Sequence, residues 1–230
     1  MGFLLRWPQL PSGAGFFLFM ARLYFLVDGL NLWHALDYLE VDSDHDRYRK
    51  FKWLSLAKRA ECYRIDKKDE IKGIEYFTTL VTWDAVKLAR HKLYIKAQEN
   101  DGVLVTYGEF KRKTVVCKGA CRKKFSTVEE KQTDVNIALR LYQLAVQDGY
   151  DKAIIISGDT DLLPAIKIVR KDYPGKQIGV VIPIGKRSED FKNQADFHYK
   201  MKEKHLATSR YDDNLILKDK STLSCPANWK

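Results

Sequence analysis

The sequence is poor in the features that mark several large classes of protein. Its 230 residues include only four cysteines, too few for a chain of this length to be a disulfide scaffold. We therefore expect a reducing, cytoplasmic compartment. No apolar run approaches the length that spans a bilayer, so neither a membrane protein nor a membrane partner is expected. The sequence also has no internal repeat and no low-complexity tract.

Several catalytic signatures are missing as well. The chain has no Gly-rich phosphate loop, no dinucleotide fingerprint and no Ser-His-Asp order of the kind that nucleophilic hydrolases use. A phosphohydrolase of the haloacid-dehalogenase type needs a second aspartate two positions after its nucleophile, but Gly29 and Leu30 follow Asp28. These absences exclude the commonest hydrolase designs.

Positive charge is what the chain has in excess. Lys and Arg number 40 and Asp and Glu number 30, which gives a net charge of +10. Such a surplus favours a polyanionic partner, either nucleic acid or an acidic membrane face. Apolar residues make up 45%, and the length suffices for one α/β domain with a well-filled core and a small appendage.

Composition divides the chain into three parts. Residues 1–19 are apolar but interrupted by prolines, and they lack the basic start and unbroken apolar stretch of a secretory signal. We expect an N-terminal extension over 1–21, with translation beginning at Met20 as a hypothesis. The domain proper is expected over 22–200, and over 201–230 a C-terminal extension that packs on the domain or trails it. From about residue 207 we expect a loosely packed tail with a short final strand.

Apolar patterning alternates between the periods of strands and helices. That alternation predicts right-handed crossovers and an α/β fold, with a largely parallel central sheet of about five strands and helices on both faces. In such sheets ligands bind beyond the carboxyl ends of the strands, near the topological switch point. The expected strands cover 23–28, 73–80, 103–110, 153–157 and 178–182, and the expected helices cover 51–65, 84–100, 129–147, 162–171 and 188–193.

Carboxylates follow two of the expected strands. Asp28 ends the first strand, and Asp159 and Asp161 follow the fourth, each group beside a glycine that permits a tight turn. If both strands are central and parallel, these side chains converge on one rim. The helix predicted from residue 129 adds Asp134, with Glu130 one turn earlier on the same face.

A carboxylate cluster of this kind is unfavourable unless a cation sits in it or some groups are protonated. Hard oxygen ligands suit Mg²⁺ or Mn²⁺, which can activate a water and stabilise the charge of phosphodiester attack. Structural alternatives stay open for single residues. Asp159 is also a candidate N-cap for the next helix, Asp134 a solvent-facing helix residue, and Asn31 a turn residue.

Three motifs occur along the chain in this order: Val27-Asp28-Gly29-Leu30-Asn31, Glu129-Glu130-Lys131-Gln132-Thr133-Asp134-Val135 and Ser157-Gly158-Asp159-Thr160-Asp161-Leu162. Together they resemble the NYN-domain family, the PIN-like nucleases that include the LabA-like proteins. The resemblance covers about 23–200 and implies a PIN-like, Rossmannoid fold. One departure is Leu162, where many relatives carry Phe, which changes packing and not metal chemistry.

The resemblance also implies roles for individual residues. Carried over by motif, the catalytic metal ligands are Asp28, Asp134, Asp159 and Asp161. Asn31 is implied as a polar companion at the rim, with Ser157 bonded to a carboxylate and Lys131 touching a phosphate.

A basic stretch over 111–124 leads into the helix expected over 129–147 and contains no acid. We interpret it as a phosphate-binding loop beside the site, with a solvated charged loop as the alternative. Its cations are Lys111, Arg112, Lys113, Lys118, Arg122, Lys123 and Lys124.

That stretch contains two cysteines, Cys117 and Cys121, and resembles a zinc knuckle. A structural zinc needs four ligands, and Cys62 and Cys225 are not at signature spacing. Reduced thiols are therefore preferred to a structural Zn²⁺.

The sequence thus predicts a metal-dependent endoribonuclease with RNA as the preferred partner. The alternative is a catalytically inactive PIN-like module that binds nucleic acid or protein.

Overall fold

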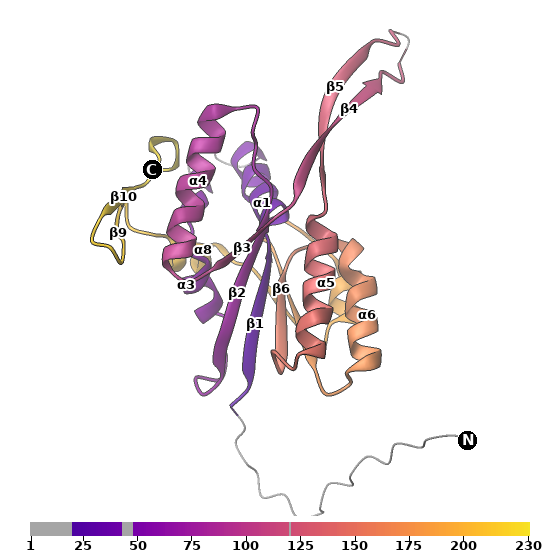
Figure 1. Cartoon of the computed structure of the whole chain (residues 1–230), viewed down its shortest axis with the longest axis vertical. Coiled ribbons are helices and arrows are strands. Elements are labelled where there is room, and N and C mark those ends of the chain that lie inside the picture. Colours follow the sequence, from indigo (N-terminus) through magenta and orange to yellow (C-terminus); the bar gives the residue numbers. More distant parts are fainter. Residues whose placement is uncertain (1–19, 43–47, 120) are drawn as a thin grey trace, which may run out of the picture.

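The computed structural model describes residues 20–42, 48–119 and 121–230, so residues 1–19 of the extension expected over 1–21 lie outside the described residues. The central sheet is built from β1 (Arg22–Asp28), β2 (Glu70–Thr78), β3 (Leu104–Tyr107), β6 (Lys152–Ile156), β7 (Gln177–Ile182) and β8 (Phe197–Lys200). The strand order is β3-β2-β1-β6-β7-β8, and every neighbouring pair is parallel. Figure 1 labels β3, β2, β1 and β6 of this sheet. The predicted fold class is confirmed, with β8 as a sixth strand that the sequence did not predict.

Strand β1 is apolar from Leu23 to Val27 because both of its faces are covered. Leu23, Phe25 and Val27 belong to one core cluster, and Tyr24 and Leu26 belong to the other. The first face is covered by α1 (Gly29–Asp42), α3 (Leu56–Glu61), α4 (Ala85–Asn100) and α8 (Glu203–Ser209), and the second by α5 (Thr133–Val146), α6 (Leu163–Asp172) and α7 (Glu189–Gln194).

The ends of several helices follow from capping side chains. Asp84 caps α4 by accepting the amides of Val86 and Lys87 at 3.1 and 2.9 Å. Ser188 caps α7 in the same way, accepting the amide of Phe191 at 3.3 Å. None of the helices in the described ranges is long and apolar enough to cross a lipid bilayer.

The prediction of a single helix over 51–65 is wrong. The segment contains a 3-10 turn, η1 (Lys50–Lys52), followed by an extended residue and then α3. The break occurs at Ser55, whose hydroxyl accepts the amide of Lys58 at 3.2 Å and so starts a new helix. Leu54 meanwhile forms an isolated bridge with Arg210.

The basic stretch over 111–124 is not a loop. It belongs to a two-stranded antiparallel ribbon, β4 (Glu109–Val116) and β5 (Lys124–Lys131), which projects from the end of the sheet where α5 begins (Figure 1). The helix predicted from residue 129 therefore starts only at Thr133. Gln132, with φ of 80°, turns the chain between β5 and α5.

The C-terminal segment is not loosely packed, contrary to expectation. After α8 it forms a small hairpin of β9 (Asn214–Ile216) and β10 (Thr222–Ser224) and a last 3-10 turn, η3 (Ala227–Trp229). Tyr211 and Trp229 are only 2% and 3% exposed and belong to the first core cluster. This segment therefore completes the core of the domain.

Candidate functional site

The strand order reverses between β1 and β6, where the chain departs to β2 on one side and to β7 on the other. Val27 pairs with Ile156, so the carboxyl ends of β1 and β6 lie side by side. This is the topological switch point, the place where open parallel sheets bind ligands. Asp28 follows Val27, and Ser157 and Asp159 follow Ile156, as the strand-end argument predicted.

Asp28 is held tightly at this point. Its side chain is only 3% exposed. One carboxylate oxygen accepts the amide of Asn31 at 3.0 Å, and the other accepts the hydroxyl of Ser157 at 2.8 Å. Gly29 follows, and a Cβ there would lie 2.6 Å from the Phe77 carbonyl oxygen. Only glycine therefore lets α1 begin directly after Asp28.

Asn31 and Ser157 connect the two strand ends. The Asn31 side-chain oxygen accepts the amide of Gly158 at 3.0 Å, which ties the first turn of α1 to the segment after β6. Ser157 is fully buried and accepts the amide of Asp159 at 3.0 Å while it donates to Asp28. A continuous chain of hydrogen bonds thus fixes the position of Asp28 relative to Asp159.

Asp159 also caps η2 (Thr160–Leu162), because its carboxylate accepts the amide of Asp161 at 3.0 Å. The capping role considered in the sequence is therefore real, and it leaves the second carboxylate oxygen of Asp159 available. Asp161 lies in the same turn and is exposed.

Asp134 and Glu130 are contributed by elements other than β1 and the segment after β6. Asp134 lies in the first turn of α5, whereas Glu130 lies on β5 and not one helical turn before Asp134 as expected. Glu130 accepts the amide of Thr133 at 3.0 Å and also its hydroxyl. The acid therefore still lies next to the helix start, although on a different element.

Burial and neighbouring negative charge raise the pKa of two of these carboxyl groups, Asp28 and Asp134. Burial raises the pKa of Asp28 to about 6, against the hydrogen bonds from Asn31 and Ser157, and the charges of Asp159 and Glu130 add to the rise. Partial burial raises the pKa of Asp134 to about 6, with further contributions from Asp28, Asp159, Glu130 and Asp161. Five acidic groups from four elements thus share one electrostatic environment.

The carboxylates do not form a tight cage. In the part of the chain that the structure describes, no three His, Cys, Asp or Glu side chains are grouped closely enough to hold a metal ion. Mg²⁺ is usually bound through one or two carboxylates, several waters and the phosphates of a substrate, and seldom by an all-protein cage. The excess of negative charge and the hard oxygen donors fit such an ion.

Two further polar residues lie at this rim that sequence reasoning missed. Thr79 and Thr133 are 2% exposed, and their hydroxyls lie 3.4 Å apart. The Thr79 hydroxyl also lies 3.5 Å from the Glu130 carboxylate. Thr79 directly follows β2, so the strand-end rule that identified Asp28 would also have identified it.

The cations predicted to bind substrate are all exposed, and most lie on the ribbon. Lys111, Arg112 and Lys113 belong to β4, Lys124 and Lys131 to β5, and Lys118, Arg122 and Lys123 to the turn between them. Lys113 and Lys131 form ion pairs with Glu129 at 3.2 and 2.8 Å. The remaining cations extend outward from the carboxylate rim.

The four cysteines are all free. Cys117 and Cys121 lie at the tip of the ribbon, and contact with Cys117 helps to lower the pKa of Cys121, after the hydrogen bond from the Lys123 backbone. Cys62 and Cys225 lie against Ser209 and Arg210 at the C-terminal side of the domain. The second pair therefore does not join the first.

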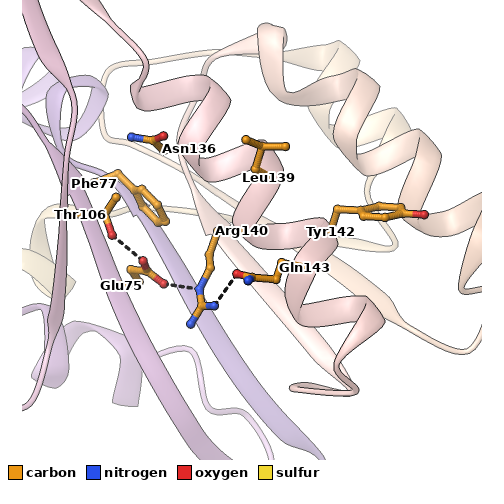
Figure 2. Close-up of a pocket in the computed structure, with 8 residues that line it drawn as sticks. All are labelled: Glu75, Phe77, Thr106, Asn136, Leu139, Arg140, Tyr142 and Gln143. Atoms are coloured by element: carbon orange, nitrogen blue, oxygen red, sulfur yellow. Dashed lines mark hydrogen bonds and ion pairs between the residues drawn. The ribbon is translucent and has the colours of Figure 1, made fainter.

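A groove of about 560 Å³ lies elsewhere, between α5 and strands β2 and β3 (Figure 2). Its central carboxylate, Glu75, accepts hydrogen bonds from Thr106 at 2.6 Å and from the Arg140 guanidinium at 2.7 Å. Arg140 also donates to Gln143 at 2.8 Å. These groups satisfy one another, so the groove contains a closed polar network distinct from the carboxylate rim.

Comparison with known proteins agrees with this architecture. A family model described as NYN domain matches residues 22–202. A crystal structure of a protein of unknown function from Vibrio parahaemolyticus superposes with a TM-score of 0.55 at 15% identity, covering 80% of this chain and 94% of that one. A segment of 56 residues is 45% identical to 6-hydroxy-3-succinoylpyridine 3-monooxygenase HspA from Pseudomonas putida, which is 24% of this chain and 18% of that protein.

Proposed function

Because the chain belongs to the NYN-domain family of PIN-like nucleases, we propose that it is a metal-dependent endonuclease that hydrolyses phosphodiester bonds in RNA. The observation that carries the proposal is the convergence of Asp28, Asp134 and Asp159 at the switch point of the sheet, where burial and then neighbouring negative charge, including that of Asp159, raise the pKa of Asp28 and of Asp134. The Vibrio structure supports the fold alone.

Asp28 and Asp159 are the residues we assign to the principal Mg²⁺ or Mn²⁺ ion, with Asp134 and Asp161 completing the set. Such an ion, when bound, activates a water and stabilises the charge that develops on the phosphate. The protein's own contribution is positional. Ser157 and the Asn31 amide hold the Asp28 carboxylate in one orientation, so little reorganisation is needed when the substrate arrives.

The basic ribbon is the part of the protein to which we assign binding of the nucleic acid. Contacts with Lys and Arg increase the affinity of a protein for a polyanion. The ribbon strand β5 ends at Lys131, just before α5, whose first turn carries Asp134. The cations of the ribbon therefore hold the nucleic acid beside the carboxylates that we assign to the metal ion. The preference for RNA over DNA rests on this charge and on family membership.

An inactive binding module is the rival. A protein that only binds a polyanion gains nothing from five acidic groups at the binding rim, which favours catalysis. The local match to a monooxygenase does not favour oxygen chemistry here, because it covers only 18% of that protein.

The test is incubation of labelled RNA and labelled DNA with the purified protein, with and without Mn²⁺. Asp159→Asn keeps the size and the capping oxygen but removes the charge, and we expect it to lower the cleavage rate by about 100-fold or more. Asp212→Asn is the matched control, since Asp212 is exposed and lies in the C-terminal segment. Equal rates for Asp159→Asn and wild type in excess Mn²⁺ would refute the assignment, and cleavage of DNA alone would refute RNA as the substrate.

A further inference from the structure

The two faces of the β4–β5 ribbon differ in how their cations are paired. Cross-strand partners of an antiparallel pair share a face. On one face Lys111 lies opposite Glu129, and Lys113 and Lys131 are its neighbours on that face. Glu129 accepts from both Lys113 and Lys131. Two of the three lysines on this face are therefore ion-paired, both with Glu129.

The opposite face has free cations beside exposed apolar side chains. Arg112 lies across from Val128, and Lys124 lies across from Val116. Among the described residues, neither Arg112 nor Lys124 has an ion-pair partner. Val116 and Val128 are 43% and 37% exposed. We call the face formed by Phe110, Arg112, Val116, Lys124, Val128 and Glu130 the open face.

The open face leads directly to the carboxylate rim. At its base Phe110 lies across from Glu130, and Glu130 accepts the amide of Thr133, which immediately precedes Asp134. A molecule that lies along this face from the tip inward therefore arrives at Asp134. The paired face has no such connection, because its base is formed by Glu109 and Lys131.

An exposed tryptophan stands at the same base. Trp83, in the turn between β2 and α4, packs edge-on against Phe110 with ring centroids 4.8 Å apart and an interplanar angle of 76°. Its side chain is nevertheless 45% exposed, whereas the other large aromatics near the sheet are mostly buried. Tryptophan and phenylalanine are the side chains on which unpaired bases stack.

We propose that Trp83, Phe110, Arg112 and Lys124 form a track for one unpaired strand of RNA. Trp83 and Phe110 stack on a base at the rim, and Arg112 and Lys124 contact phosphates farther out. Single-stranded RNA is favoured because the bases of a duplex are stacked on each other and offer no free face. The choice of RNA rests on the proposed function, but the proposal concerns binding and not cleavage.

The aromatic part is tested by the affinity of the full chain for a short labelled single-stranded RNA, measured by fluorescence anisotropy. The chain carries Asp159→Asn and the buffer contains EDTA, so that cleavage does not interfere. We expect Trp83→Ala to weaken binding by about 10-fold, whereas Trp83→Phe retains most of the affinity. Circular dichroism checks that both variants are folded.

The electrostatic part is tested by two double variants that each remove two positive charges. Arg112→Ala with Lys124→Ala is expected to weaken binding and to reduce the slope of log K against log salt by about 1.4. Lys113→Ala with Lys131→Ala removes the same charge from the paired face and is expected to cause a smaller loss.

Three outcomes overturn the track: wild-type affinity for Trp83→Ala, equal losses in the two double variants, or equal affinity for the same RNA as a duplex. Cleavage of that RNA by the wild type in Mn²⁺ is measured separately. If binding depends on Trp83 but the wild type does not cleave the RNA, the track is supported and the proposed nuclease activity is refuted. If the wild type cleaves the RNA but Trp83→Ala binds it with unchanged affinity, the nuclease activity is supported and the track is refuted.

Discussion

The Asp134 side chain has no hydrogen-bond partner among the described residues, although four other carboxylates influence it. Its pKa of about 6 lies above the ordinary value of 3.8. The folded protein therefore keeps a proton on Asp134 between about pH 4 and pH 6, where the unfolded chain has already lost it. The stability of the folded protein therefore falls as the pH rises from about 4 to about 6, and above pH 6 the ionised Asp134 destabilises the fold to its full extent.

Asp134→Asn removes that cost. In EDTA, we expect the variant to be more stable than the wild type at pH 8 by about 1 kcal/mol, because solvent screens the charge of this half-exposed group, and we expect the difference to vanish as the pH falls toward 4. Urea denaturation across this pH range measures the difference. A gain that is the same at pH 4 and pH 8 would show that the charge of Asp134 is not its cause.

At the residue scale, the sequence predicts the carboxylates on strand ends better than those on other elements. Asp28 and Asp159 follow buried apolar runs, and parallel strands place such residues on one rim whatever the details of packing. Glu130 was assigned to the helix because nothing local distinguishes residues 129–131 from a helical start. The left-handed conformation of Gln132 is set by the folded chain, so this boundary could not be read from residue types.

Among the elements, α1 is tied to the segment that follows β6. The Asn31 side chain accepts the Gly158 amide, and this is the side-chain bond that joins the two segments directly. Removal of the acceptor leaves a partly buried amide without its partner, which costs about 1 kcal/mol.

We therefore expect Asn31→Ala to lower the free energy of unfolding by about 1 kcal/mol and to speed hydrogen exchange at the Gly158 amide. Asn193→Ala, at an exposed position of α7, serves as the matched control. Unchanged exchange at Gly158 in Asn31→Ala would show that this bond does not hold the two segments together.

The ribbon shows why some elements escape sequence analysis. A strand is recognised when apolar and polar residues alternate, and alternation arises when one face is buried. The residues of β4 and β5 are mostly exposed on both faces, so their sequence reads as a charged loop. The central strands are apolar because helices cover them, and for them the sequence prediction is confirmed.

For the molecule as a whole, the family match ends at residue 202, but the hydrophobic core does not. Trp229, next to the C-terminus, packs against Trp33 with ring centroids 5.4 Å apart and against Trp53 at 6.2 Å. The segment is polar on average, and its few apolar residues have no helical or strand period, so composition suggested a loose tail. Its packing comes from isolated large side chains that only the tertiary structure brings inward.

Trp229→Ala is therefore expected to lower the free energy of unfolding by about 3 to 5 kcal/mol, as for other large-to-small changes in a core. Ile216→Ala is the control from the same segment, because Ile216 is 71% exposed and its loss should cost little. Chemical denaturation of both variants measures the two costs. If both variants lose equally little free energy of unfolding, the segment lies on the domain without stabilising it. If only Trp229→Ala loses much, a chain shortened to the family boundary lacks part of its core.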